Sequence, residues 1–474
     1  MTPRKMRHCD RPAPPDPHLC SFLTMSQTGE LDHRYLWHPF TQQRGWEEED
    51  PLVIEAAEGT DLIDVDGRRY IDGVSSLWCN IHGHRHPLID QAVRDQLDRV
   101  AHSTMLGLTH APAAELAARL IDLAPPGQSR VFYSDSGSTA VEIALKMAFQ
   151  YWQQRGDRHT RRTSFVNLTN AYHGDTVGAV SVGGIDLFHS TYDPLLFGSH
   201  QVPPGDVTAL AAVLDLHEEE IAAVIVEPLV QGAAGILVQP PGYLRAVRQL
   251  CDAHDVLLIC DEVATGFGRT GTMFACEQER VAPDLLCLGK GLTNGYMPLA
   301  ATLAAERIYE GFLGEAADLR TFFHGHTFTG NPLACAAAIA SLDVFEAEHT
   351  LLRLQPKIRL LHDILEPIAA MSEVAEVRGR GFMVGIDLGR RDSADRVGHR
   401  VAEEARRRGA IVRPLGETIV LMPPLAISKS ELVRLVEITA ASISAAVAGV
   451  GAGEGGSRLA SATEEAPPQM SEAA

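Results

Sequence analysis

The sequence lacks the features by which several classes of protein are recognised. Its eight cysteines form no Cys-x-x-Cys pair, and 41 lysines and arginines stand against 61 aspartates and glutamates, giving a formal net charge of −20. Proteins that bind nucleic acid or an anionic membrane surface use clustered Lys and Arg, so neither partner is expected. No uninterrupted apolar run approaches the roughly 20 residues of a membrane-spanning helix. These absences predict a soluble protein.

The cysteines are scattered and several lie within apolar runs, which is typical of buried free thiols in a reducing compartment. The N-terminal stretch MTPRKMRHCDRPAPPDPHLC is basic and proline-rich, but it has no apolar core of the kind that a secretory signal requires. The sequence therefore predicts a cytoplasmic location, with either Met1 or Met25 as the start of translation.

The length of 474 residues is enough for two domains. Residues 1–30 and 448–474 are rich in Pro, Gly, Ala, Ser and Glu, and we expect them to be disordered because they cannot bury enough apolar surface. Residues 91–345 are predicted to form a large domain. Residues 31–90 and 346–447 combine short strand patterns with helices and are predicted to fold together as a smaller α+β domain.

The large domain alternates amphipathic helices with short apolar runs. The helical segments include TAVEIALKMAFQYW and NPLACAAAIASLDVF, and the apolar runs include TSFVNL, AAVIVEP, VLLICDE and DLLCLGK. Strands that alternate with helices form a mainly parallel sheet with helices on both faces, so the predicted fold class is α/β. Active sites in such sheets gather at the carboxyl ends of the strands.

One lysine ends an apolar run at such a position. Lys290 is the only charged residue in LLCLGKGLTNGYMPLAATL, and Asp261 ends the apolar run VLLIC before it. A lysine at a strand end can simply extend its stem over apolar surface. A lysine and an aspartate from neighbouring strand ends also suit pyridoxal 5'-phosphate (PLP). Its aldehyde takes a lysine as a Schiff base, and its ring nitrogen stays protonated beside a carboxylate.

Two further segments suit the same cofactor. Ser136, Gly137 and Ser138 directly precede a predicted helix, where free backbone N–H groups and the helix dipole favour a phosphate, although such residues often serve only as a cap. Tyr172 follows the strand TSFVNL and could stack on the cofactor ring, although core packing would also account for it. The order of these residues at successive strand ends is what favours a PLP site.

The stretches HGHRH and HGH contain five histidines that could be metal ligands: His82, His84, His86, His324 and His326. No cysteine or carboxylate shares their spacing, and a single metal would require the histidines to converge. No metal site is therefore predicted.

The span from Tyr35 to about Pro424 resembles the class III family of PLP-dependent aminotransferases. The stretches LICDEVATGFGRTG and PDLLCLGKGLTNGYMPLAA are similar to the family's signature around its aspartate and its cofactor-binding lysine. The resemblance implies a PLP-dependent transferase of fold type I that acts on small molecules as a homodimer.

The resemblance implies roles for the candidate residues around the cofactor. Lys290 would form the Schiff base and move protons, Asp261 would pair with the ring nitrogen, and Tyr172 would stack on the ring. Residues 136–138 would hold the phosphate, helped by Thr327 from the neighbouring subunit. Lys290 and Tyr172 would also contact the substrate.

For the substrate, the resemblance implies that Arg413 of IVRPLG pairs with a carboxylate, a use that suits the planar guanidinium. Phe40 and Trp78 would line the substrate cleft, and Gly325 would contribute from the loop HGHTFTGNP.

Short stretches near both ends narrow the resemblance. YLWHPFTQ, SSLWCNIHGHRHP, HGHTFTGNPLACAAA and the pair IVRPLG and IVLMPPL are similar to members that transfer an amino group from S-adenosylmethionine to 8-amino-7-oxononanoate in biotin biosynthesis. Phe40 and Leu77 depart from the tyrosine and tryptophan of many such members, so lysine stays open as the amino donor.

Other functions stay open as well. An ω-amine:pyruvate aminotransferase of the same class would share every cofactor residue, and a racemase or aminomutase of the same fold is a more distant alternative. A nicotinamide dehydrogenase lacks its phosphate fingerprint and, like a binding or scaffold protein, leaves Lys290 unexplained.

Overall fold

The computed structural model describes residues 25–391 and 395–452, which divide into two compact units. The first unit contains the described residues up to Ala57 together with Leu62–Arg69. The second contains Glu58–Asp61 and the described residues from Tyr70 onward.

The helices of eight residues or more are α1 (Met25–Tyr35), α4 (Pro87–Leu97), α5 (Ala111–Leu123), α6 (Gly137–Gln153), α9 (Val207–Leu216), α10 (Tyr243–Ala253), α12 (Pro332–Ala347), α13 (Thr350–Ala369), α14 (Val397–Arg407) and α15 (Lys429–Ala452). Shorter helices are α2 (Gln43–Trp46), α3 (Ser75–Trp78), α7 (Val177–Ser181), α8 (Asp186–His189) and α11 (Glu306–Gly311). The first unit contains α1 and α2 together with most of β1 (Ile54–Glu58) and β2 (Asp61–Asp64).

The second unit is built around a seven-stranded sheet with the order β4-β12-β11-β10-β7-β5-β6. Its strands are β4 (Gln128–Ser134), β5 (Ser164–Leu168), β6 (His200–Val202), β7 (Ile221–Val226), β10 (Leu257–Asp261), β11 (Leu285–Leu288) and β12 (Ala300–Ala305). All neighbours from β11 to β6 pair in parallel, whereas β12 is antiparallel to both β11 and β4. The predicted α/β fold with a mainly parallel sheet is confirmed.

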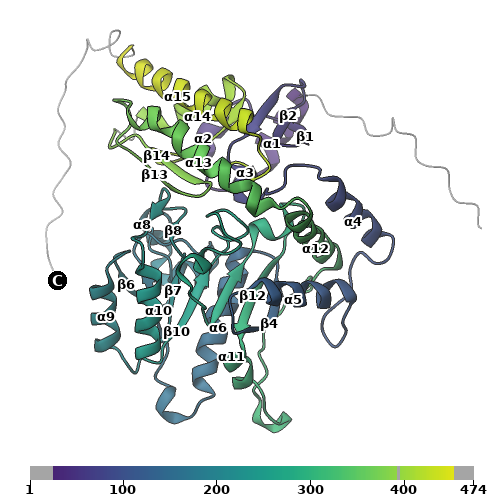
Figure 1. Cartoon of the computed structure of the whole chain (residues 1–474), viewed down its shortest axis with the longest axis vertical. Coiled ribbons are helices and arrows are strands. Elements are labelled where there is room, and N and C mark those ends of the chain that lie inside the picture. Colours follow the sequence, from purple (N-terminus) through teal and green to yellow (C-terminus); the bar gives the residue numbers. More distant parts are fainter. Residues whose placement is uncertain (1–24, 392–394, 453–474) are drawn as a thin grey trace, which may run out of the picture. The chain divides into compact units, whose positions relative to one another are not determined.

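Helices cover both faces of this sheet, as Figure 1 shows around β10, β7 and β12. Every residue of β7, β10 and β11 is buried, which is why these strands are continuous apolar runs rather than alternating ones. Leu257 and Ile259 pack in one core cluster with the apolar side chains of α6, and Leu258 and Cys260 belong to the cluster on the other face.

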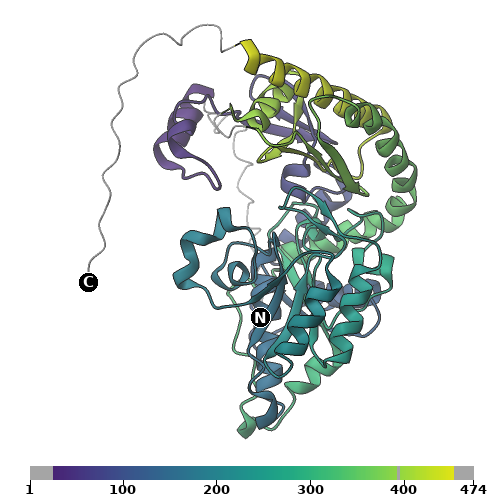
Figure 2. The same ribbon diagram turned by 90° about the vertical axis from the view of Figure 1, so that its left-hand side faces the viewer.

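A smaller sheet follows in the same unit, with the order β13-β14-β17-β16 and antiparallel pairing throughout. Its strands are β13 (Glu376–Arg380), β14 (Met383–Asp387), β16 (Arg413–Leu415) and β17 (Thr418–Leu421). The helices α13, α14 and α15 pack beside it (Figure 2). A two-stranded hairpin is formed by β8 (Val230–Gln231) and β9 (Leu237–Val238).

One strand pair joins an early segment to a late one. β3 (Arg69–Asp72) pairs in parallel with β15 (Ala410–Ile411) through Ile71 and Ala410. A contribution of residues 31–57 to the same small domain stays a prediction, because they belong to the first unit.

The predicted disordered ends are too long by a few residues. Residues 25–30 belong to α1, and residues 448–452 belong to the end of α15. Further along α1, Asp32 lies 2.9 Å from His38 and accepts a hydrogen bond of 2.7 Å from the Trp46 indole, so polar contacts outside residues 25–30 support the helix to which they belong. The remaining residues of both predicted ends lie outside the described ranges.

Within the described residues, α15 is long and apolar enough over Lys429–Gly449 to cross a membrane, by length and composition alone. It packs against α13 and α14, and its Leu432, Leu435 and Ile443 are fully buried. Core packing therefore accounts for its apolar character.

Candidate active site

Four strands of the large sheet end at the same edge, and each leads to a residue predicted for the site. Ser136 follows β4, Tyr172 follows β5, Asp261 ends β10 and Lys290 follows β11. Asp261 pairs with Cys287 across the two neighbouring strands, so Lys290 comes shortly after the partner of Asp261. The sheet therefore brings these residues to one edge.

Lys290 lies in an aromatic and acidic environment. Its Nζ is 4.7 Å from the centroid of the Trp78 ring. Burial lowers the pKa of the Lys290 amine, and the carboxylates of Asp261 and Glu227 act in the opposite direction. A lowered pKa increases the fraction of the amine that is neutral and nucleophilic at neutral pH. A lysine that only covers apolar surface does not need a nucleophilic amine.

Asp261 is held by a histidine that sequence reasoning did not assign. The Nδ1 of His173 lies 2.7 Å from Oδ2 of Asp261, and the backbone N–H of Val263 donates to Oδ1 over 3.0 Å. Both Asp261 and His173 are buried, and Nε2 of His173 has no protein partner among the described residues. The only sequence signal was the position of His173 directly after Tyr172.

Glu227 is a second buried carboxyl group that the sequence did not reveal as part of the site. It follows β7 and accepts hydrogen bonds from the backbone N–H groups of Tyr172 (3.2 Å) and Gly232 (2.9 Å). Burial raises the pKa of Glu227 to about 7, so a substantial fraction is the neutral acid at neutral pH. Glu227 thus ties the loop of Tyr172 to the turn before β9.

The N-terminus of α6 provides donors for an anion. Ser136 is the N-cap, and Ser138 Oγ accepts a hydrogen bond of 3.1 Å from the backbone N–H of Asp175, which leaves the Ser138 O–H free to donate. A side chain on Gly137 would come within 2.5 Å of Val263, and one on Gly174 within 1.9 Å of Ser138. The glycines therefore allow three segments to meet around the helix N-terminus, a suitable environment for a phosphate.

Tyr172 is fixed at both ends. Its hydroxyl donates to Asp175 Oδ2 over 2.8 Å, and its backbone N–H donates to Glu227. Burial and the Asp175 carboxylate raise the pKa of the phenol, so it stays neutral. A tyrosine held in this way offers a flat, fixed face to a ring.

Trp78 sits on a strained turn. The four residues from Ser75 to Trp78 all have φ between 47° and 72°, in the left-handed region. For residues other than glycine this costs about 1–2 kcal/mol each. Two anchors compensate: Ser75 Oγ donates to the Met422 carbonyl over 2.6 Å, and the Ser76 hydroxyl donates to Asp72 over 2.8 Å. The turn presents the buried Trp78 ring to Lys290.

Arg413, on β16, has a half-buried guanidinium that makes no hydrogen bond or ion pair with the described residues. Burial lowers its pKa, and the nearby Tyr172 acts in the opposite direction. A guanidinium keeps its positive charge at neutral pH, so Arg413 is a charged group without a counterpart in the part of the chain that the structure describes. This is the state required of a residue that binds a carboxylate from outside the protein.

The histidine-rich stretches have protein partners rather than a shared centre. His84 lies 2.9 Å from Asp72, and His86 lies 3.1 Å from Glu348. His82 packs against the ring of Phe345, and burial lowers its pKa to about 3. His324 accepts from Lys146 over 3.0 Å.

The contacts of this site do not test the roles of three predicted residues. Phe40 belongs to the first unit. Gly325 and Thr327 are exposed on the loop before α12, and no described contact joins either to Lys290. Their roles stay predictions.

The site fits PLP on its own chemistry. The lysine amine of lowered pKa suits the PLP aldehyde, and the buried carboxylate of Asp261 suits its ring nitrogen. The fixed ring of Tyr172 suits the ring face, and the glycine-flanked N-terminus of α6 suits the phosphate. Together with the mainly parallel sheet, they define a PLP-dependent enzyme of fold type I.

The chain belongs to the class III aminotransferase family, whose model, described as "Aminotransferase class-III", matches residues 43–443. The predicted family, fold type, aminotransferase activity and PLP cofactor are confirmed.

Relatives and solved structures agree with this membership. The adenosylmethionine-8-amino-7-oxononanoate aminotransferase of Nitratidesulfovibrio vulgaris is 57% identical over 441 residues, which cover 88% of this chain and 81% of the relative. The crystal structure of the enzyme of that name from Methanocaldococcus jannaschii is 44% identical, with a TM-score of 0.87 over 89% of this chain and 99% of that one. A PLP-bound amine transaminase from an uncultivated Pseudomonas species is 38% identical, with a TM-score of 0.81 over 87% and 99%.

Proposed function

We propose that this enzyme transfers an amino group from S-adenosylmethionine to 8-amino-7-oxononanoate, giving 7,8-diaminononanoate in biotin biosynthesis. The observation that carries the proposal is the 57% identity over 441 residues with a relative named for these two substrates. Relatives of the same name from Geobacter sulfurreducens and Aquifex aeolicus are 50% and 49% identical over 86% and 85% of the chain. The chemistry of Arg413 and Trp78 supports this choice of substrates.

Each residue of the proposed site has a distinct task. Bound PLP supplies an aldehyde that accepts amino groups and a ring that withdraws electrons from the adjacent carbon. Lys290 Nζ would hold the cofactor and carry protons during transfer, a role that its burial favours by lowering the pKa of the amine. Asp261, oriented by His173, would keep the ring nitrogen protonated. Residues 136–138 would hold the phosphate, and Tyr172 would stack on the ring.

The same site must accept two substrates in turn, and both carry a carboxylate that Arg413 would bind. S-adenosylmethionine also has a sulfonium and a flat purine, which favour an aromatic surface such as that of Trp78 beside Lys290. Lysine as donor would instead need a carboxylate for its second ammonium. These features favour S-adenosylmethionine.

An ω-amine:pyruvate aminotransferase is the second candidate. An omega transaminase from Pseudomonas jessenii in complex with PMP is 29% identical to this chain, with a TM-score of 0.85. A donor panel tests the two proposals, with 8-amino-7-oxononanoate as acceptor in one series and pyruvate in the other. We expect the highest specificity constant for S-adenosylmethionine with 8-amino-7-oxononanoate. A far higher constant for lysine would contradict the donor, and a preference for pyruvate would contradict the acceptor.

Arg413→Ala is expected to weaken both half-reactions by roughly 1.5–3 kcal/mol in transition-state stabilisation, the range for a lost charged hydrogen bond. Single-turnover kinetics with each substrate, followed by cofactor absorbance, measures the two halves separately. Arg434→Ala is a matched control, because Arg434 is exposed on α15. Loss in one half-reaction alone would show that Arg413 binds only one of the substrates.

We further propose a cytoplasmic homodimer that binds neither nucleic acid nor membrane. Two loops of the second unit expose large apolar side chains, with Leu106 89%, Phe323 75% and Phe328 59% exposed. The loops meet where the rings of His102 and Phe328 lie 5.1 Å apart. Soluble monomers rarely leave large contiguous apolar patches in water, so this surface supports subunit contact, with Thr327 reaching the partner's phosphate site.

A further inference from the structure

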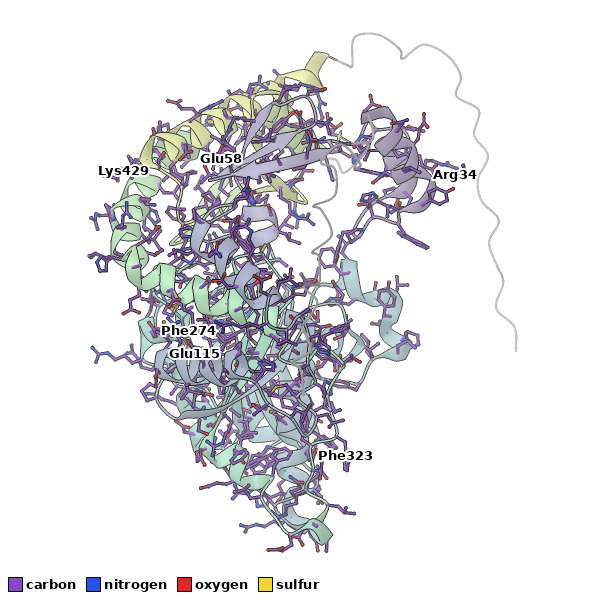
Figure 3. The ribbon with its side chains drawn as sticks, turned by 90° about the vertical axis from the view of Figure 1, so that its right-hand side faces the viewer. Arg34, Glu58, Glu115, Phe274, Phe323 and Lys429 are labelled. Atoms are coloured by element: carbon purple, nitrogen blue, oxygen red, sulfur yellow. The ribbon has the colours of Figure 1, made fainter. Side chains whose placement is uncertain are left out.

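The loop that carries Gly325 and Thr327 has little regular structure to fix it. Residues 319–331 form no helix or strand, and Phe323 projects from this part of the second unit (Figure 3). On its C-terminal side the loop is closed by Thr329, whose Oγ1 donates to the His326 carbonyl over 2.9 Å. The Gly330 carbonyl lies 2.8 Å from His110. A second anchor must hold the N-terminal side if Thr327 is to have a defined position.

That anchor is the exposed face of α6. Lys146 Nζ donates to the Phe323 carbonyl over 3.3 Å and to His324 Nδ1 over 3.0 Å. One helical turn further, Gln150 Nε2 donates to the Thr321 carbonyl over 3.1 Å. The imidazole of His324 stacks on the Phe322 ring at 5.7 Å and 15°. Side chains four residues apart on one helix therefore bind three loop residues, Thr321, Phe323 and His324.

The contact of Lys146 with His324 requires a neutral imidazole, because Nδ1 accepts the hydrogen bond. Burial, followed by the positive charge of Lys146, lowers the pKa of His324. The other charged groups near His324 are Glu142, which acts in the opposite direction and accepts a 2.7 Å hydrogen bond from the Gly178 backbone N–H, and His326. At neutral pH the lysine and the imidazole thus form a compatible donor and acceptor.

The same helix begins at the predicted phosphate site. Gly137 and Lys146 are nine residues apart on α6, which corresponds to about 13 Å along a rigid rod. We propose that Lys146 is a positioning residue of the shared active site. The N-terminus of α6 holds the cofactor of the same subunit, and Lys146, further along α6, fixes the loop that carries Thr327. The fixed loop then reaches the cofactor of the partner subunit. The inference rests on the homodimer proposed above. Lys146 would therefore act through the loop that carries Thr327, by its contacts with Phe323 and His324.

Mixed dimers assign this effect to one subunit or the other. When only one subunit of a dimer carries Lys290→Ala, the dimer keeps one working site, that of the other subunit. In a trans dimer, a subunit with both Lys146→Met and Lys290→Ala pairs with a native subunit, so the working site receives the altered loop. In a cis dimer, the two changes lie on different subunits, so the working site receives an unaltered loop. Two different affinity tags allow each mixed dimer to be purified.

We expect the working site of the trans dimer to bind PLP about tenfold more weakly, as for a weakened charged hydrogen bond to a phosphate. The cis dimer should match a dimer of native and Lys290→Ala subunits. Lys146→Arg should restore binding in the trans dimer, and Lys429→Met, the same change on the exposed start of α15 (Figure 3), should have no effect in either.

PLP binding that is weaker in the cis dimer than in the dimer of native and Lys290→Ala subunits, or equal in the cis and trans dimers, would overturn the role of Lys146. Either result would leave the proposed reaction and homodimer intact. A monomer in sedimentation at working concentrations would overturn the homodimer and this inference together, but not the transamination.

Discussion

Lys290→Ala is expected to abolish multiple-turnover transamination, with a loss of more than about 10⁴-fold, the upper range for removal of a positioned proton-transfer group. The variant also loses the covalent attachment of the cofactor, so its near-visible absorbance band should disappear. The fold should remain, because Lys290 makes no hydrogen bond with the described residues. Its amine interacts only through the ring contact with Trp78 and through the charges of nearby groups such as Asp261 and Glu227. Such a cation–π contact is worth about 0.5–2 kcal/mol.

The test needs activity, absorbance and thermal unfolding on the same preparation. Lys357→Ala is a matched control, because Lys357 is also partly buried and its pKa is also lowered by burial, but it donates to the Leu425 carbonyl. The control should keep both activity and the absorbance band. Repeated turnover by the Lys290→Ala enzyme would show that another group carries the amine chemistry.

The sheet and the four strand-end residues were predictable because short-range patterns encode them. Continuous apolar runs such as those of β10 and β11 occur where helices cover both faces, and the polar residue that ends each run must lie at the sheet edge. Asp261 ends its run, whereas Lys290 and Tyr172 come two and four residues after the strands that precede them. Parallel order then places them on one side without any knowledge of side-chain contacts.

The support of the site could not be predicted, because it depends on contacts between segments distant in sequence. Glu227 ends an apolar run in the same way as Asp261, but its partners are backbone N–H groups, which no side-chain pattern reveals. The left-handed turn that carries Trp78 is equally hidden, since none of its four residues is glycine. Its anchor is the Met422 carbonyl, far along the chain.

The two adjacent carboxylates at the end of β10 show how the structure separates function from support. Successive strand residues point to opposite faces. Asp261 meets His173, whereas Glu262 accepts hydrogen bonds from the backbone N–H groups of Ala275 and Cys276, both over 2.8 Å. Burial raises the pKa of Glu262 to about 7. The sequence Asp-Glu alone does not state which of the two faces the cofactor.

Asp261→Asn is therefore expected to retain some cofactor but to lose most activity. A neutral amide cannot hold the positive charge on the ring nitrogen, and an opposite charge at hydrogen-bond distance shifts such a pKa by about 1–3 units. If the electron-withdrawing strength of the ring follows that charge, kcat/KM should fall by roughly 10–10³-fold. The hydrogen bond from His173 can persist to the amide oxygen, so the fold should change little.

Glu262→Gln is the matched control, since it makes the same kind of change one residue further along. It removes one acceptor oxygen from a buried cluster of backbone donors, so the melting temperature should fall while the pH profile and absorbance of the bound cofactor stay native. Asp261→Asn should show the reverse, a near-native melting temperature with a shifted cofactor spectrum and a low kcat. Near-normal rates in Asp261→Asn, or a spectral shift in Glu262→Gln alone, would assign the ring nitrogen to Glu262 and overturn the arrangement argued from β10.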